Sequence, residues 1–385
     1  KSLAHTVPSA RFRQWPEPGT TSTGGWLETA WHQFAPYYDW CPVDPLTGQR
    51  CVAGCVTIAL AQILNYCGIH TGVILTPSDY YTSKTRSIHI DSDSVHLDFP
   101  SFYSLNRTWQ KIPSAFAGKR PLSPHEIAAL NFTIAILMKT DFTSEFSGVS
   151  FGAEKVLTDR FHYHSARLID ADQLTPHIVK QNMMNGQPVL LILPGHAVLV
   201  DGYNTSGFYH LNFGWGEFKP DFITNMWVKL FDPPQAGSFP ISHAVVDIAP
   251  FGQEKLSASS SNIHLEACQV GLCSVPRSLF LENNHHNDMN IDFILSEEPF
   301  QMSISGSDYS DSLGAFMIPA QTSVELNIRY TPQEPKVTTG DILISYNQEK
   351  NWLVIHAQGS ISPVCGTVIG AGPVSGLWRS SESPY

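Results

Sequence analysis

The pattern of hydrophobic and polar positions divides the chain into a first part that mixes helices with strands and a second part that alternates as β-strands do. Apolar residues recur at positions 56, 60, 63 and 64, a spacing that predicts a helix starting at Cys55 with one face packed inward. The run Ser123-Pro124-His125-Glu126 has the sequence of a capping box with proline at the first helical position, so a helix is expected to start there. Two further helices are expected at 152–162 and 175–186.

The segment that follows has the pattern of β-strands. An apolar run at 189–193 is interrupted by Pro194-Gly195, and a second apolar run starts at Ala197. With a third strand expected at 208–213, these runs predict a set of hairpin strands. His196 would stand at the start of the middle strand, where a rigid scaffold can hold its imidazole in one place.

Beyond residue 250 the composition and the hydrophobic pattern of the chain change. Residues 251–262 are rich in serine and are expected to form a linker, and 364–385 is a Gly/Ser/Pro-rich stretch expected to be flexible. Between them, half-buried strands separated by turns are typical of a β-sandwich. The clearest of these strands are 278–284, 324–330 and 341–346.

Cys55 and His196 are the best candidates for chemistry. A cysteine in the first turn of a helix lies near unsatisfied N–H groups and the positive end of the helix dipole, both of which favour the nucleophilic thiolate. Such a thiolate needs a base, and His196 can supply it. Asn212 could orient the imidazole by accepting its N–H, and Trp215, between two glycines, could cover the pair and exclude water.

These residues resemble those of the streptopain family of secreted bacterial cysteine peptidases. The resemblance covers roughly residues 25–248, and its four segments occur in the family's order. The segments are Trp31-His32-Gln33-Phe34-Ala35-Pro36-Tyr37, Gly54-Cys55-Val56 with Ala61-Gln62-Ile63, Gly195-His196-Ala197 with Asp201-Gly202, and Phe208-Tyr209-His210-Leu211-Asn212 with Gly214-Trp215-Gly216. The sequence departs from the family pattern at Thr57-Ile58, Pro194, Phe213 and Glu217, and none of these departures removes a reactive group.

The resemblance implies a papain-like fold and a site that transfers an acyl group to Cys55. It assigns one oxyanion donor to the side chain of Gln33, beside the backbone N–H of Cys55. Gln49 is a rival donor, because it precedes Cys55 by six residues, a papain-like spacing. The family gives more weight to the indole at position 215 than to an orienting amide, so Trp215 and Asn212 both remain candidates.

Ser147 and Gly195 are expected to contact the substrate. Ser147 lies in the loop before the helix expected at 152, and Gly195 directly precedes His196. Residues 263–361 resemble the Ig-like domains appended to secreted bacterial proteins. They show no catalytic constellation of their own, so this part is expected to bind surface or extracellular ligands.

Composition excludes several classes of protein. The chain has 385 residues and a formal net charge of −11, which argues against a nucleic-acid partner, and no Lys/Arg cluster in the sequence offsets that charge. No apolar run is long enough to span a membrane. The chain starts at Lys1 without Met, and too few residues precede the matched region for a separate pro-domain, so a mature form is expected.

The cysteines leave two questions open. Cys51 and Cys55 have metal-like spacing, but no second pair with zinc spacing follows, so neither a metal nor another cofactor is expected. Cys41 could pair with Cys51, and Cys268 with Cys273, in an exported protein. Seven cysteines is an odd number, which leaves at least one free thiol.

The sequence thus predicts an α+β papain-like two-lobe cysteine peptidase domain followed by an all-β Ig-like sandwich. The expected function is a secreted cysteine endopeptidase, extracellular or on the cell surface, that acts on protein or peptide substrates. An amidase or transglutaminase on the same fold, and a catalytically relict binding protein, are the alternatives. The expected divisions are an N-terminal segment (1–24), the peptidase domain (25–250), the linker (251–262), the sandwich (263–361) and the tail (362–385).

Overall fold

The computed structural model describes residues 12–69, 72–149, 152–216, 223–231, 240–250, 256–267, 269–304, 306–348 and 351–361. Contacts divide the chain into two compact units. The first comprises Lys1–Lys255 with Ser345–Leu353, and the second comprises Leu256–Ile344 with Val354–Tyr385. Among the described residues, no helix is long and apolar enough to cross a membrane.

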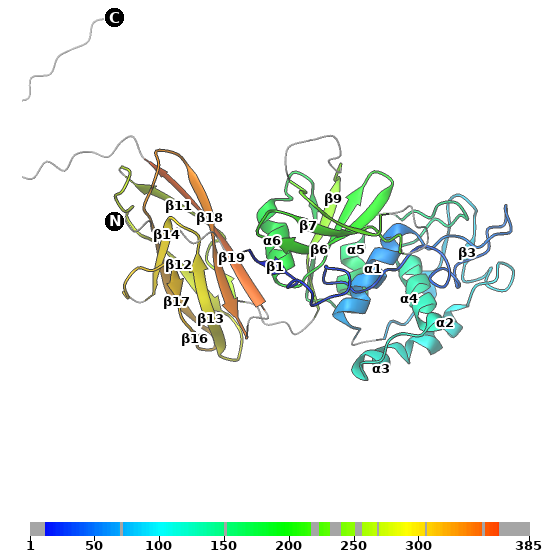
Figure 1. Cartoon of the computed structure of the whole chain (residues 1–385). Helices are drawn as coiled ribbons and strands as arrows, with labels where there is room; N and C mark the ends of the chain where they lie inside the picture. The colour runs from blue at the N-terminus through cyan, green and yellow to red at the C-terminus, as the bar shows by residue number, and fades with distance from the viewer. Residues whose placement is uncertain are drawn as a thin grey trace, which may run out of the picture. The chain divides into compact units, whose positions relative to one another are not determined.

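The first unit combines helices with one large antiparallel sheet (Figure 1). Its helices are α1 (Cys55–Cys67), α2 (Phe102–Trp109), α3 (Ile112–Ala117), α4 (Pro124–Leu137), α5 (Ala153–Lys155) and α6 (Pro176–Met184), with a 3₁₀ turn η1 (Pro77–Asp79) and a π-helical turn η2 (Val156–Arg160). Its strands are β1 (Gln14–Trp15), β2 (Tyr81–Thr82), β3 (His89–Ile90), β4 (Ser165–Asp170), β5 (Val189–Leu193), β6 (His196–Asn204), β7 (Tyr209–Asn212), β8 (Asn225–Val228) and β9 (His243–Ala249). The strand order of the sheet is β4-β9-β5-β6-β7-β8, with β1 paired to the end of β6, and β2 pairs with β3 separately.

Helix α1 lies at the centre of this unit, packed against α4 and strand β6 (Figure 1). Every residue from Thr57 to Leu64 is buried. The expectation of a single inward face is therefore wrong, because neighbouring elements cover α1 from more than one side. The helix that begins at Cys55 is held by the core of the unit.

The start of α4 has the predicted capping box. The Ser123 hydroxyl accepts the N–H of Glu126 at 3.3 Å, and the Glu126 carboxylate accepts the N–H of Ser123 at 2.8 Å. Both guanidinium Nη atoms of Arg120 donate to the same carboxylate, at 2.8 and 2.9 Å. These hydrogen bonds, led by those of Arg120, hold the pKa of Glu126 at about 2 although burial would raise it.

The substitution Glu126→Gln is expected to lower the free energy of unfolding by about 2 kcal/mol near neutral pH, because charge-assisted hydrogen bonds are lost. A depressed carboxyl pKa stabilises the fold above its ordinary value of 4.5, and the effect is lost as the pH falls towards about 2. The difference from wild type should therefore shrink over that interval, measured by urea unfolding at several pH values. Exposed Glu17→Gln is the control, and a difference that persists at the acid end would contradict the assignment.

Several elements differ from the sequence-based expectations. Helices α2 and α3 and strand β4 were not predicted. The short strand β10 (Ser257–Ala258) pairs with β12 (Arg277–Asn283) inside the segment expected to be a linker. Cys41, Cys51 and Cys273 are free thiols, so a Cys41–Cys51 disulfide is not formed, and Cys268 lies outside the described residues.

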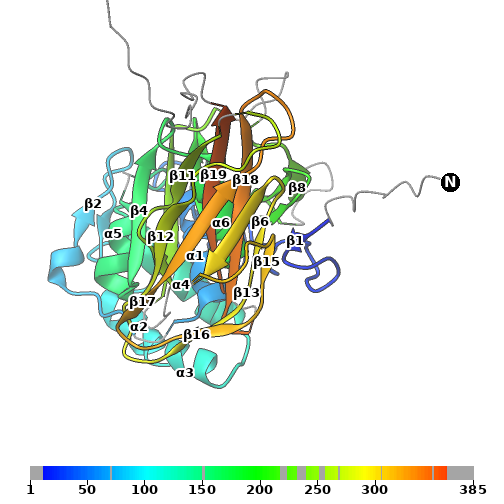
Figure 2. The ribbon, with the colours of Figure 1, turned by 90° about the vertical axis from the view of Figure 1, so that its left-hand side faces the viewer.

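Strands are the only regular elements among the described residues of the second unit (Figures 1 and 2). One sheet has the order β10-β12-β17-β14, with β17 at Thr322–Tyr330 and β14 at Phe300–Ile304. The other has the order β11-β19-β18-β13-β15, and β16 also pairs with β13. Its strands are β11 (Asn262–Ala267), β13 (Met289–Ser296), β15 (Ser312–Leu313), β16 (Phe316–Ile318), β18 (Thr338–Tyr346) and β19 (Asn351–Ile361).

Alternating burial in these strands follows the period-2 pattern of the sequence. Leu326, Ile328 and Tyr330 of β17 are buried, and Leu326 pairs directly with the buried Leu279 of β12. This sheet thus has an apolar face. The strands expected at 278–284, 324–330 and 341–346 correspond to β12, β17 and β18.

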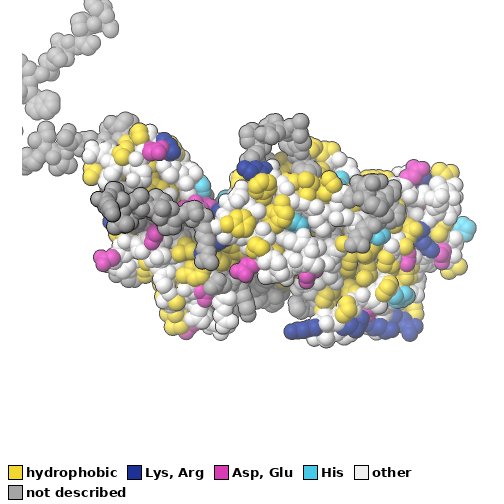
Figure 3. Space-filling model, viewed as in Figure 1, with side chains coloured by type: hydrophobic (Ala, Val, Ile, Leu, Met, Phe, Trp, Pro, Cys, Tyr) yellow, Lys and Arg dark blue, Asp and Glu magenta, His cyan; other side chains and the backbone are white. Residues whose placement is uncertain are grey.

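Positive charge is gathered on one edge of the first unit. Figure 3 shows Lys and Arg side chains along the edge that carries α2 and α3. These helices and the turns beside them contain the exposed Arg107, Lys111, Lys119 and Arg120. These four cations lie within residues 107–120, so this positive edge comes from one stretch of an otherwise acidic chain.

Candidate active site

Cys55 follows a glycine whose surroundings leave no room for a side chain. Gly54 has φ of +92°, and a Cβ placed on it would lie 2.9 Å from the carbonyl oxygen of Ser147. Only glycine adopts this conformation without strain at so close an approach. Gly54 therefore fixes the backbone conformation just before α1. The Cys55 thiol then lies among the N–H groups of the first helical turn.

The thiol of Cys55 is largely enclosed. Burial raises its pKa above the ordinary value, and the backbone N–H groups of Ala197, Val56 and Cys55 itself lower it only in part. The expectation that the helix N-terminus makes this thiol acidic on its own is therefore not met. Of these three N–H groups, that of Ala197 belongs to another element, strand β6.

His196, the residue before Ala197, opens strand β6 opposite Leu193 of strand β5. Because the N–H of Ala197 faces the Cys55 sulfur, adjacent residues of β6 carry the imidazole and the thiol's backbone donor. Nε2 of His196 donates to the carbonyl oxygen of Phe213 at 3.0 Å, which leaves Nδ1 as the proton acceptor. Burial lowers the pKa of His196, and the Phe213 carbonyl partly opposes that shift.

Trp215 covers the imidazole. Its ring is stacked on that of His196, with centroids 4.9 Å apart and an angle of 17° between the planes. Gly214, at φ +67°, brings this segment against α1, since a Cβ there would touch Ile58 at 3.7 Å. The indole thus contacts the expected base and shields it from solvent on that face.

Asn212 does not hold the imidazole as the papain-type pattern suggested. Its amide nitrogen donates to Thr29 O at 3.1 Å and to Gln62 Oε1 at 3.3 Å, and its Oδ1 accepts the N–H of Gly214 at 3.0 Å. The hydrogen bond expected from Asn212 is made by the neighbouring carbonyl of Phe213. Asn212 instead ties β7, α1 and the segment around Thr29 together.

The two candidate oxyanion donors lie in different surroundings. Gln33 is partly buried, and its carbonyl oxygen accepts the N–H of Ala53, two residues before Cys55, at 3.2 Å. Gln49 is exposed on a turn where its carbonyl oxygen accepts the N–H of Asp44 at 2.8 Å. Gln33 therefore lies beside the backbone segment that precedes Cys55, whereas Gln49 lies on an exposed turn.

The two expected substrate contacts differ in accessibility. Gly195 is exposed, and nothing lies within 4 Å of the position that a Cβ would occupy. Ser147 is only 2% exposed, and its hydroxyl is bonded to the backbone of Thr143. Its side chain is therefore engaged inside the protein, and its backbone packs on Gly54.

Sequence reasoning missed two backbone groups of the site, the N–H of Ala197 and the carbonyl of Phe213. Side-chain identity carries no signal for either, although each adjoins a residue that was singled out. Within the described residues, no three His, Cys, Asp or Glu side chains converge as metal ligands would. The absence of a metal from the chemistry stays a prediction.

Comparison with known proteins identifies the family. Residues 31–222 match the Peptidase C10 family. The thiol protease/hemagglutinin PrtT of Porphyromonas gingivalis is 25% identical over 221 residues, which are 54% of this chain and 24% of that protein. Streptopain of Streptococcus pyogenes is 26% identical over 188 residues, 46% of each chain.

The chain thus spans less than half the length of these curated relatives. Among solved structures, a PapD-like domain of human CEP192 aligns with 34% of this chain and 99% of its own, at 13% identity and a TM-score of 0.24. A similarity that low carries no argument. The family match covers both Cys55 and His196, and through residues 31–222 this chain belongs to the peptidase C10 family, the streptopain family of cysteine peptidases.

Proposed function

We propose that this chain is a secreted cysteine endopeptidase in which Cys55 and His196 hydrolyse peptide bonds through an acyl-enzyme. The observation that carries the proposal is the contact between the Cys55 sulfur and the N–H of Ala197, the residue next to His196. The imidazole is further held by the Phe213 carbonyl and covered by Trp215. A nucleophile beside an oriented base is the arrangement that covalent acyl transfer requires.

Burial disfavours the thiolate form of Cys55 and the imidazolium form of His196 when each group is considered alone. It raises the pKa of Cys55 and lowers that of His196. Thiolate and imidazolium therefore form together, by transfer of the Sγ proton to Nδ1, because each charge then offsets the cost of burying the other. The two groups titrate as a unit.

The reaction follows from this pair. The thiolate attacks the peptide carbonyl carbon, and the carbonyl oxygen becomes an oxyanion that accepts from the N–H of Cys55 and the side-chain amide of Gln33. The imidazolium of His196 then protonates the leaving amine as the C–N bond breaks. Water, deprotonated by His196, attacks the thioester and releases the acid and the free thiol.

The substitution Gln33→Ala is expected to lower kcat by roughly ten- to a thousand-fold with little change in KM, the range for loss of one oxyanion donor. Gln49→Ala is the matched control and should leave both constants unchanged. The measurement is steady-state hydrolysis of a short fluorogenic peptide. Normal turnover in Gln33→Ala together with loss in Gln49→Ala would transfer the role to Gln49.

The substrate chain is proposed to run past the two loops that border the thiol. Open space around Gly195 supports contact with substrate at its backbone. Ser147 would contribute through its backbone, because its hydroxyl is bonded to Thr143. Asn212 is proposed to act indirectly, by fixing the strand that precedes Phe213 and Trp215.

The wider architecture belongs to the same proposal. We infer a papain-like arrangement of helices and antiparallel sheet for residues 25–250 and an Ig-like sandwich for 263–361. The two all-β sheets of the second unit support the latter, and its role would be to engage surface or extracellular ligands. Secretion is inferred from the resemblance to the streptopain family.

One experiment tests the function directly. The protein is incubated with unfolded casein under reducing conditions, with and without a thiol-trapping epoxide, and the products are sequenced. Internal cleavage that the epoxide abolishes supports the endopeptidase. Ammonia release or amine incorporation without chain cleavage would favour an amidase or transglutaminase, and no reaction with either casein or epoxide would indicate a relict site.

A further inference from the structure

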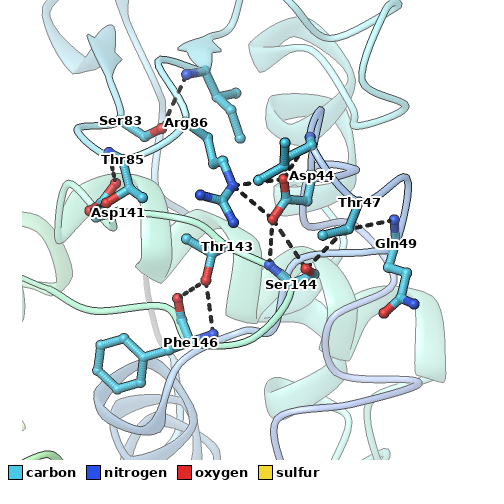
Figure 4. A network of polar contacts seen from close by, with 12 residues as sticks. Asp44, Thr47, Gln49, Ser83, Thr85, Arg86, Asp141, Thr143, Ser144 and Phe146 are labelled. Carbon is cyan, nitrogen blue, oxygen red and sulfur yellow. Dashed lines mark hydrogen bonds and ion pairs between the residues drawn. The ribbon is translucent and has the colours of Figure 1, made fainter.

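Asp44 is a fully buried carboxylate outside the catalytic pair. Its side chain is 0% exposed and accepts hydrogen bonds from Arg86 Nε, at 2.8 and 3.0 Å, and from the N–H of Leu46 at 2.9 Å. It also accepts the backbone N–H of Ser144 at 2.9 Å and the hydroxyl of that residue at 3.1 Å. Figure 4 shows Arg86 and Ser144 converging on this carboxylate from different loops. Burial alone would raise the pKa of Asp44, but these donors hold it at about 2, so Asp44 stays charged at working pH.

Ser144, one of the partners of Asp44, lies on a loop whose two ends are hydrogen-bonded to each other. Residues 141–148 form this loop, and backbone hydrogen bonds of 2.8 and 3.2 Å join Asp141 to Gly148. Thr85, beside Arg86, donates its N–H and its hydroxyl to the Asp141 carboxylate at 2.8 and 2.6 Å. The segment 85–86 thus holds the base of the 141–148 loop directly and its middle through Asp44 (Figure 4).

The same loop contacts two of the three residues that precede Cys55, namely Val52 and Gly54. The carbonyl of Thr143 accepts the N–H of Val52 at 3.1 Å. The carbonyl of Ser147 lies where a Cβ on Gly54 would approach it to 2.9 Å. Two carbonyls of one loop therefore fix the path by which the chain reaches Cys55.

We propose that the Asp44–Arg86 ion pair is a positioning device for catalysis, acting through the 141–148 loop on the backbone of Cys55. It rests on the proposed function, because the N–H of Cys55 matters as an oxyanion donor only if acyl transfer occurs. Displacement of the loop moves residues 52–54 and turns that N–H away from the oxyanion. An ångström-scale displacement of a catalytic group costs up to about a hundredfold in rate.

The expected defect is specific. An oxyanion donor acts in the transition state, so kcat and kcat/KM should fall together while KM changes little. Alkylation of Cys55 by iodoacetamide needs the thiolate and its base, but it forms no oxyanion at a carbonyl. The alkylation rate should therefore stay within about threefold of wild type while peptide turnover falls by roughly ten- to a hundredfold.

The test uses Asp44→Asn, which keeps the shape of the side chain but removes its charge and turns one acceptor into a donor. Active sites are counted with a thiol-directed epoxide, and kcat, KM, alkylation rate and thermal unfolding are measured on the full chain. The matched control is Asp79→Asn, which breaks the Arg160–Asp79 pair of 2.6 Å at the 3₁₀ turn η1. It should lower the unfolding temperature without changing kcat per titrated site.

Two milder variants cover the case in which Asp44→Asn does not fold. Arg86→Lys keeps the positive charge and removes the Nε donor, and Ser144→Ala removes one hydroxyl while its backbone N–H remains. Each is expected to lower kcat by roughly three- to tenfold at nearly wild-type unfolding temperature. This decrease is smaller than the one expected for Asp44→Asn, because each variant keeps part of the hydrogen bonding around Asp44.

The outcomes separate the two proposals. Wild-type kcat per titrated site in Asp44→Asn, or in both milder variants, overturns the positioning role and leaves the endopeptidase intact. An equal fall in peptide turnover and in alkylation would also overturn it, because the thiol–imidazole pair itself would then be disturbed. A wild-type protein that cleaves no peptide overturns the proposed function and this inference with it.

Discussion

Peptide cleavage is expected to disappear in Cys55→Ser, with kcat/KM lower by roughly 10⁴-fold or more. The reason is that a serine hydroxyl does not ionise against the same imidazole, so no comparable nucleophile replaces the thiolate. The fold should be retained, because sulfur and oxygen occupy similar space at a half-buried position. Hydrolysis of a fluorogenic peptide and circular dichroism measure the two effects.

Cys51→Ala is the control for this experiment. Cys51 precedes Cys55 by four residues, but it is fully buried, and burial raises the pKa of its thiol to about 12. It is therefore expected to be unreactive, and its loss should leave turnover per titrated site unchanged. Activity that survives in Cys55→Ser and vanishes in Cys51→Ala would reverse the assignment.

The variant His196→Ala is expected to lose as much activity as Cys55→Ser, because the two groups act as a unit, and the double variant should be no worse than either single one. The pH dependence of alkylation gives a second measurement. Without the base, the thiolate must form alone at a thiol whose pKa burial raises above 9.0. The alkylation profile should therefore shift to higher pH, with the loss greatest near neutrality.

Exposed His164→Ala serves as the control and should alkylate and cleave as wild type does. If His196→Ala retained more than about a tenth of wild-type turnover, the concerted role of the pair would be wrong. A wild-type profile identical to that of His196→Ala would show that the thiol ionises without help from the imidazole.

Local sequence signals predicted the parts of the fold that depend on local chemistry. The Ser123–Glu126 capping box marked the start of α4, and Pro194-Gly195 marked the turn between β5 and β6. Helix α2 was missed although Ser101 caps it and Phe102, Leu105 and Trp109 are buried along it. That signal spans only eight residues, too few for a periodicity to stand out from its surroundings.

The candidate site was less predictable where backbone atoms or burial decide the chemistry. Asn212 had the right side chain to hold an imidazole, but Thr29, Gln62 and Gly214 take up its amide, and the carbonyl of Phe213 reaches His196 instead. The position of Cys55 at a helix start suggested an acidic thiol. Its enclosure by neighbouring elements reverses the net effect, and enclosure is a property of the tertiary fold.

The burial of helix α1 has a consequence for when activity can appear. The residue with the thiol is continuous with a helix whose residues Thr57 to Leu64 all lie inside the folded unit, and the imidazole arrives on a strand more than a hundred positions later in the chain. A chain that ends before strand β6 lacks the imidazole, and an unfolded chain does not hold the two groups together. On the mechanism proposed here, a folded core is therefore a condition for activity, and a chain that has not yet folded cannot cleave its neighbours.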